Sequence, residues 1–233
     1  MGWNLKNFRK KIFIFGIFGS IQFVVLSTIA MFFYAGGTQI DPSSKGYSFW
    51  FNYFSDLGLT VTYSGAPNTV PLIMFVTFFF IWGSSIIALF VSLPSMFLET
   101  RGGRWISIIG GVFAIIVGMG IIGLVIYPAD IEPLIHSIWA AIHYLALMVV
   151  EICTAIAIFL SKSFPKKYGL FLLISAIIIS ISIIIFLTGP ILFLTPEWLA
   201  TYVMEQKIMT YTFLAAIGAT AYCAWKLSST NNN

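Results

Sequence analysis

The segment Tyr127–Thr154, YPADIEPLIHSIWAAIHYLALMVVEICT, has a long apolar run after Pro133 that contains three histidine or acidic side chains. These are His136, His143 and Glu151, and they include both histidines of the 233-residue chain. A helix of about 20 apolar residues is long enough to cross the hydrocarbon core of a membrane. The segment therefore predicts a membrane-spanning helix that carries ionisable groups inside the membrane.

The composition of the whole chain is that of a membrane protein. Hydrophobic residues make up 59% of the sequence and charged residues 9%, with a mean hydropathy of +0.98. Soluble domains carry about 25% charged residues, so a soluble globular core is excluded. The net charge of +4 comes largely from short loops and does not indicate a nucleic-acid partner. Cys153 and Cys223 lie in apolar runs and are interpreted as small core residues.

Six segments are apolar and long enough to span a membrane. Pro71, Pro133 and Pro196 stand near the starts of three of them, where proline is compatible with the first helical turn. The sequence therefore predicts an all-α polytopic membrane protein, with residues 1–233 forming one six-helix transmembrane domain. The expected spans are residues 12–34, 70–93, 105–127, 131–160, 168–187 and 196–225.

The basic residues predict an orientation. Ten of the twelve Lys and Arg residues fall on one side of the expected bundle, and Lys45 and Lys207 fall on the other. The positive-inside rule then places both termini in the cytoplasm of a cell-membrane protein. The longest extracytoplasmic loop, residues 35–69, holds six aromatic side chains within Tyr47–Phe54. Aromatic rings favour the membrane–water interface, so we expect a short interfacial or re-entrant helix over the end of the bundle.

His136, His143 and Glu151 share one helix face. At about 100° per residue, His136, His143 and Glu151 fall within a quarter-turn stripe, with His143 about 10 Å deeper than His136 and Glu151 another 12 Å deeper. Ionisable groups inside a membrane usually face the bundle interior or a cavity, although each could also be satisfied separately. No Lys or Arg matches the depth of Glu151, so we expect a neutral carboxyl bonded to Thr154, Ser20, Gln22, Ser84, Ser85 or Thr220.

Further candidate binding residues lie toward the acidic side. Glu205 could pair with His136 or with Lys207, or could face lipid headgroups. Residues seven apart, such as the two histidines, do not converge easily on one metal ion, and no cofactor motif or catalytic nucleophile is evident. We therefore expect no metal, no cofactor and no catalytic residue. The candidate ligand-binding residues are Asn52, Ser55, Asp56, Asp130, His136, His143, Glu151, Glu205 and Lys207.

Two stretches indicate a family. Asn52–Gly58, NYFSDLG, resembles the ISDLG signature of a prokaryotic six-span family known as domain of unknown function 998. Gly123–Asp130, GLVIYPAD, followed by His136, is similar to that family's junction between spans three and four. Glu205 and Lys207 stand where the family tends to place an acidic–basic pair. The resemblance covers nearly the whole chain. It implies a six-helix bundle in which the polar residues on the extracytoplasmic side are important for function.

A more remote resemblance links the layout to eukaryotic autophagy-modulator and GPI-lipid-remodelling membrane proteins. These have a Ser-Asp/Glu-x-Gly motif in the same loop, but the proline that precedes their apolar residue is missing before Phe54 here. This resemblance implies a preference for lipids and supplies no reaction.

The expected function is therefore lipid binding or processing in an outward-facing polar pocket, where Asp56, His136 and Glu205 would contact a headgroup. The expected partners are membrane lipids. One alternative is a scaffold subunit with a membrane-protein partner. Another is a small proton-linked transporter that uses His143 and Glu151 as a relay, although no inverted repeat is visible. An intramembrane enzyme stays open, but the sequence shows no nucleophile or convergent metal ligands for it.

Overall fold

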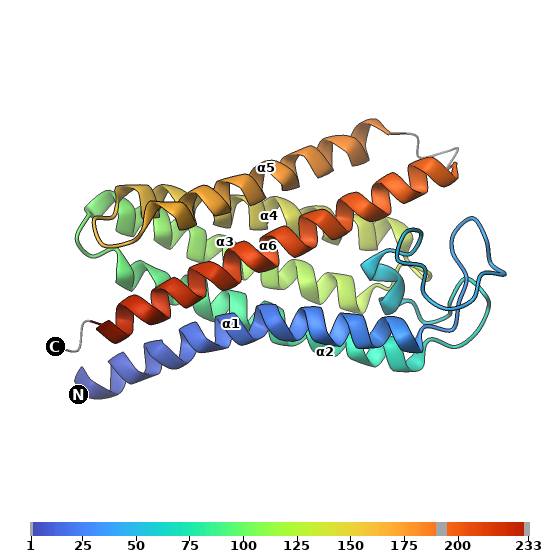
Figure 1. Ribbon diagram of the computed structural model, residues 1–233, viewed down its shortest axis with the longest axis horizontal. Coiled ribbons are helices and arrows are strands. Elements are labelled where there is room, and N and C mark those ends of the chain that lie inside the picture. Colours follow the sequence, from blue (N-terminus) through green and yellow to red (C-terminus); the bar gives the residue numbers. More distant parts are fainter. Residues whose placement is uncertain (1, 190–194, 231–233) are drawn as a thin grey trace.

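Six long helices run side by side in the computed structural model, which describes residues 2–189 and 195–230 (Figure 1). Two short 3-10 helices, η1 and η2, lie in the connections before and after α2. The elements are α1 (Gly2–Phe33), η1 (Phe54–Gly58), α2 (Thr69–Ser92), η2 (Leu93–Met96), α3 (Arg101–Ile126), α4 (Pro133–Leu160), α5 (Lys166–Thr188) and α6 (Pro196–Thr230).

The helices form a closed ring in sequence order. Each helix packs against the next one along the chain, and α6 packs against α1. Glycines allow the closest of these approaches, as at Gly120, where an added Cβ atom would lie 2.9 Å from the Cα atom of His143. Small residues at such crossings let helix backbones come together in lipid, where dispersion contacts replace the hydrophobic effect. The glycines of α3 therefore fix the position of α4 and of its histidines.

The predicted six-span architecture is confirmed, since six helices are long and apolar enough to cross a membrane. The ends of the first and last helices differ from the expectation. Helix α1 begins at Gly2 rather than near residue 12, and α6 continues to Thr230 rather than ending near residue 225. The polar residues there are compatible with helix, so the helices extend beyond the apolar runs that the sequence reveals.

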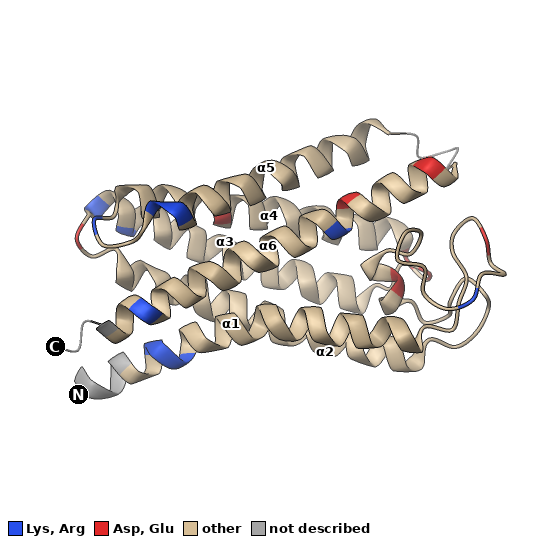
Figure 2. Cartoon of the chain, viewed as in Figure 1, with Lys and Arg blue, Asp and Glu red and all other residues tan. Residues whose placement is uncertain are grey.

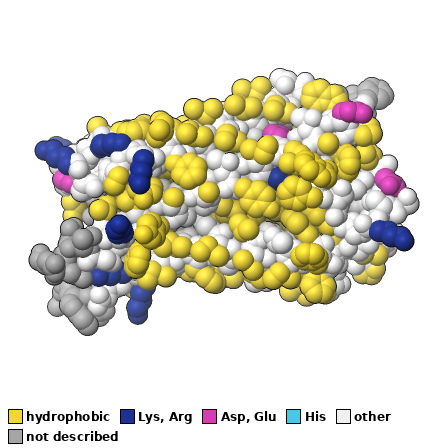
Figure 3. Space-filling model, in the orientation of Figure 1, with side chains coloured by type: hydrophobic (Ala, Val, Ile, Leu, Met, Phe, Trp, Pro, Cys, Tyr) yellow, Lys and Arg dark blue, Asp and Glu magenta, His cyan; other side chains and the backbone are white. Residues whose placement is uncertain are grey.

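The two ends of the bundle differ in charge. Lys and Arg gather where α1 begins and α6 ends, whereas most Asp and Glu lie toward the opposite end (Figure 2). Hydrophobic side chains cover the surface between these ends (Figure 3). We call the first the basic end and the second the loop end, because the α1–α2 loop, residues 34–68, covers it. This asymmetry supports the proposal that the basic end faces the cytoplasm.

A cysteine-labelling experiment tests that orientation. Lys45 at the loop end and Lys162 at the basic end are both exposed, and the native Cys153 and Cys223 are buried. We expect an impermeant maleimide added to intact cells to label the Lys45→Cys variant and to spare Lys162→Cys. The reverse pattern would overturn the orientation.

The α1–α2 loop differs from the expected interfacial helix. Its aromatic stretch is irregular, and the one short helix there, η1, begins at the end of that stretch. Phe49 and Trp50 are exposed, whereas Phe54 is buried. The reason is that part of the aromatic cluster folds inward around a buried cation from α6, which a helix parallel to the membrane would not allow.

Candidate functional site

Asp56 is the centre of a buried hydrogen-bond network in the α1–α2 loop. Its Oδ2 atom accepts bonds from Asn52 Nδ2 at 2.9 Å and from the Tyr53 backbone N–H at 3.0 Å, and its Oδ1 atom accepts one from the Tyr63 hydroxyl at 3.4 Å. Burial raises the pKa of Asp56 to about 6, and these donors together with the positive charge of Lys207 limit the rise. The Asp56 carboxylate therefore has its acceptors occupied by the loop itself.

Two asparagines complete this network. Asn52 is fully buried, and its Oδ1 atom accepts from Ser48 N while its Nδ2 atom also donates to Gly37 O. The Nδ2 atom of Asn68 lies within 3.2 Å of the carbonyl oxygens of Asp56, Leu57 and Leu59. Both side-chain amides stabilise the folded loop, because their N–H groups satisfy backbone carbonyl oxygens that are buried there.

Lys207 ties α6 to the same loop. Its ammonium donates to the carbonyl oxygen of Asn52 at 2.5 Å and lies 5.0–5.5 Å from the ring centres of Tyr47, Phe49 and Phe54. The side chain is 1% exposed. Aromatic faces attract a cation, and the attraction is larger when water is excluded. We call Lys207 and these three rings the aromatic cage; the rings stabilise a buried cation that would otherwise be costly in the membrane.

A second contact fastens the loop beside the cage. The backbone N–H of Phe54 donates to Gln206 Oε1 at 2.8 Å. Two adjacent residues of α6 therefore hold the segment that leads into η1: Gln206 through a neutral hydrogen bond and Lys207 through a charged one.

Asp130 connects the α3–α4 junction to the α1–α2 loop. Its carboxylate accepts from the Thr60 backbone N–H and hydroxyl and from Val61 N, at 2.5–3.1 Å. Burial alone would raise the pKa of Asp130, but these hydrogen bonds outweigh it and lower the pKa. Asp130 is thus engaged within the chain as a structural tie.

His136 and His143 of α4 line one small enclosed cavity near the loop end. Its volume is about 30 Å³, enough for about two water molecules. The Nδ1 atom of His136 lies 2.8 Å from Tyr127 O, and that of His143 lies 3.4 Å from Val117 O. The rest of the cavity's polar lining comes from η1, α4 and α6, namely Ser55, Tyr144, Gln206 and Thr210.

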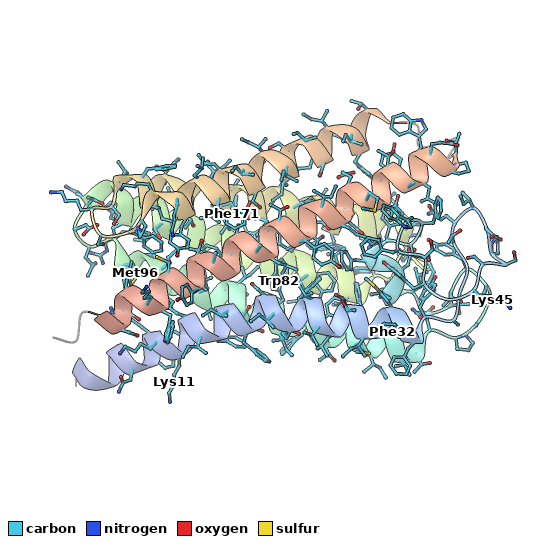
Figure 4. The ribbon with its side chains drawn as sticks, in the orientation of Figure 1. Lys11, Phe32, Lys45, Trp82, Met96 and Phe171 are labelled. Carbon is cyan, nitrogen blue, oxygen red and sulfur yellow. The ribbon has the colours of Figure 1, made fainter. Side chains whose placement is uncertain are left out.

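An aromatic ring lies behind the cavity wall. Trp82, in the middle of the bundle (Figure 4), lies 5.5 Å from the His143 ring and stacks at 5.1 Å on Phe213, which lines the cavity. Below His143, the next residue of the predicted stripe is Leu147, which is fully buried. An apolar side chain therefore lies between His143 and Glu151 along this face of α4.

Glu151 is separate from the histidines. It is fully buried, and its Oε1 atom accepts from Ser175 Oγ of α5 at 2.8 Å. The partner groups that the sequence predicts for Glu151 are therefore wrong, because they lie on α1, α2, α4 and α6 rather than on α5. The order of helices around the bundle, which the span list does not give, decides which hydroxyl meets this carboxyl.

This contact gives a prediction for Glu151. Glu151→Gln keeps a carbonyl oxygen for Ser175, so we expect its free energy of unfolding to change by less than about 0.5 kcal/mol at neutral pH. Glu151→Leu leaves the Ser175 hydroxyl without this acceptor and should cost roughly 1–2 kcal/mol. Reversible unfolding in mixed micelles measures both variants. Equal losses for Gln and Leu would show that the carboxyl carries a charge the fold needs.

Glu205 faces α5 rather than the histidines. Its side chain bonds to Ser182, while His136 bonds to Tyr127. Thus Asp56, His136 and Glu205 do not line one pocket, because only His136 of these three faces the cavity. Among the described residues, no group of three His, Cys, Asp or Glu side chains is close enough to hold a metal ion.

Sequence reasoning missed several contributing residues. Gln206 and Thr210 line the cavity, and their polar character one turn apart in an apolar helix was the available signal. Glu99 was also missed: it accepts from Ser161 and from Lys162 N at 2.7 Å at the basic end. The hydrogen bond from Ser161 and others at this turn lower the pKa of Glu99, outweighing its slight burial.

A larger groove lies on the other side of the α1–α6 pair. Its volume is about 540 Å³, and it is open to the surroundings of the bundle. Residues of α1 and α6 line it without any charged side chain. Small side chains hollow it out, among them Ser20, Ala215, Gly218 and Ala219. Both of its walls belong to membrane-spanning helices, so hydrocarbon surrounds its mouth.

One family model matches this chain over residues 28–226, and it describes a protein of unknown function, DUF998. The match begins near the end of α1 and reaches into the last turns of α6. No curated protein and no solved structure matches the chain. The resemblance to the eukaryotic lipid-remodelling proteins stays a prediction. Since the match covers α2 to α5 completely and most of α6, which is well over half of the chain, the chain belongs to the DUF998 family.

Proposed function

We propose that this protein binds a membrane lipid and holds a hydrocarbon chain in the groove between α1 and α6. The observation that carries this proposal is the groove itself, which has a volume of about 540 Å³ and is lined almost entirely by apolar surface. An apolar recess in a membrane has no water to exclude, so its occupant is hydrocarbon that packs against its walls.

The length of the groove fits one chain. Its lining on α6 runs from Tyr211 to Tyr222, about 16 Å at 1.5 Å per residue. This is close to half of the roughly 30 Å hydrocarbon thickness of a bilayer. A single extended acyl or alkyl chain can therefore lie along it.

The charged groups Asp56, Asp130 and Lys207 at the loop end do not supply a headgroup site in this arrangement. Asp56 and Asp130 bind the chain's own donors, and Lys207 is enclosed by the aromatic cage. Recognition of the lipid thus rests on its chain first, and the expected contact of a headgroup with Asp56 is not part of this proposal.

Filling the groove tests the proposal. Ala215 lines the groove and is exposed, and Ala141 is exposed on α4 outside it. We expect mass spectrometry of lipids that copurify in detergent to find at least about fivefold less lipid per protein for Ala215→Leu than for wild type, a free-energy change of about 1 kcal/mol. Ala141→Leu is the matched control and should retain the wild-type amount. Equal retention by both variants would show that the groove holds no specific lipid.

A further inference from the structure

The histidine cavity and the α1–α6 groove approach each other at one place. Phe54 lines the cavity, Tyr211 lines the groove, and their ring centres are 5.6 Å apart in an edge-to-face contact. Consecutive residues of α6 face opposite sides: Phe213 faces the cavity, and Leu214 faces the groove. The Phe54 and Tyr211 rings are thus in contact where the two spaces come close. Polar side chains line the cavity among aromatic ones, whereas the groove is lined almost entirely by apolar surface.

The histidine cavity has no Asp, Glu, Lys or Arg in its lining, and it offers hydrogen-bonding groups among its apolar side chains. Each histidine directs Nδ1 toward a backbone carbonyl, so Nδ1 carries the proton in that contact. In a neutral imidazole this leaves Nε2 as an acceptor. The Tyr144 hydroxyl lies within reach of the side chains of Thr210 and Gln206, which add donors and acceptors. Such a cavity suits a small uncharged group that both donates and accepts, which is a hydroxyl.

We propose that the cavity and the groove form one site for a lipid alcohol, with the hydrocarbon chain in the α1–α6 groove and the hydroxyl in the histidine cavity. This rests on the proposed lipid-binding function and names the chemical class of the ligand. To enter the cavity, the hydroxyl separates the rings of Phe54 and Tyr211, which are in contact in this structure. A charged headgroup is excluded, because the cavity of about 30 Å³ has no room for its hydration and no unpaired countercharge among its lining residues.

The position of Phe54 couples this entry to the α1–α2 loop. Its backbone N–H is bonded to Gln206, and its ring belongs to the aromatic cage around Lys207. The contact between the two rings is thereby held by α6 itself, the helix that lines both spaces.

The test uses 1-hexadecanol and its methyl ether as an equimolar pair added to the full-length protein in detergent. The two probes share a chain, but the ether cannot donate a hydrogen bond. Native mass spectrometry reports the ratio of the two bound forms. We expect wild type to favour the alcohol about tenfold, the preference given by about one hydrogen bond.

Variants of the cavity separate the hydroxyl contact from chain binding. Thr210 is buried and lines the cavity, and Thr210→Val removes its hydroxyl while it keeps the shape of the side chain. Ser55→Ala removes the hydroxyl that η1 contributes to the cavity. At least one of them should reduce the preference to below about threefold while total binding of the two probes persists. Thr212→Val, whose hydroxyl bonds to Ile208 O of its own helix, is the control and should keep the wild-type ratio.

The outcomes are distinct. Equal binding of alcohol and ether by wild type overturns the lipid-alcohol site and leaves chain binding in the groove intact. A wild-type preference that both cavity variants retain also overturns it, because the hydroxyl then binds elsewhere. If neither probe binds wild type and Ala215→Leu retains as much copurified lipid as wild type, the proposed function fails as well.

Discussion

Asp56→Ala is expected to lower the free energy of unfolding by roughly 2–4 kcal/mol. The substitution leaves the Asn52 amide and the Tyr53 backbone N–H buried without their acceptor, and each such donor costs about 1–3 kcal/mol. Asp56→Asn is the matched control, because its carbonyl oxygen can accept both bonds while its amide faces the Tyr63 hydroxyl. We expect Asn to keep most of the stability at pH 7 in reversible unfolding in mixed micelles. A loss for Asn as large as for Ala would show that the charge, rather than the hydrogen bonds, supports the loop.

The same residue predicts a pH dependence. Burial raises the pKa of Asp56 to about 6 from 3.8, so the folded protein binds the proton more tightly than the unfolded chain does. The stability from this group is therefore fully present below about pH 4 and is lost as the pH rises to about 6. The shift corresponds to roughly 3 kcal/mol. Asp130 and Glu99, whose pKa values are lowered, act in the opposite direction.

Comparing wild type with Asp56→Asn across pH 4–7 isolates Asp56, since both proteins retain the other carboxylates. We expect the stability difference between Asn and wild type to shift in favour of Asn as the pH rises. A difference that stays constant would mean that Asp56 titrates near its ordinary value.

Gly120→Ala is expected to cost about 1–3 kcal/mol, the range for inserting atoms into a packed interior. An added Cβ atom would lie 2.9 Å from both Cα and Cβ of His143 and 3.1 Å from its backbone nitrogen. Because the obstacle includes backbone, α3 and α4 must separate, and both histidines would move with α4. Thermal unfolding in detergent measures the loss.

Gly102→Ala in the same helix is the control. Its added Cβ atom would meet Leu160 Cδ1 at 3.6 Å, an ordinary contact, so alanine there should be neutral or slightly stabilising. If the two alanines had equal effects, the close approach of α3 and α4 would not be what limits substitution at Gly120.

The sequence predicted the parts of this protein that depend on local patterns. Apolar length located all six helices, and helical periodicity placed His136, His143 and Glu151 on a buried face. The contact of Asp56 with the backbone N–H of Tyr53, three residues earlier, is equally local. These features follow from neighbours within a few residues along the chain.

Contacts between distant segments were not predictable in the same way. Lys207 is bonded to Asn52, 155 residues earlier, and Glu151 is bonded to Ser175 of the next helix. The choice among several hydroxyls depends on the rotation and neighbours of each helix, which a list of spans does not contain. The groove was missed for the same reason, because it exists only between α1 and α6.

The aromatic cage also has a consequence for assembly during synthesis. The ribosome completes the α1–α2 loop long before it makes Lys207, and the contact that closes the cage joins positions 52 and 207. Until α6 arrives, Tyr47 and Phe54 lack their cation, Phe54 lacks its bond to Gln206, and α1 lacks one of its two neighbours in the ring. The first loop to be translated is therefore among the last parts to reach its final structure. A nascent chain that stops after α5 would expose this loop, without its contacts to α6, to the quality-control machinery of the membrane.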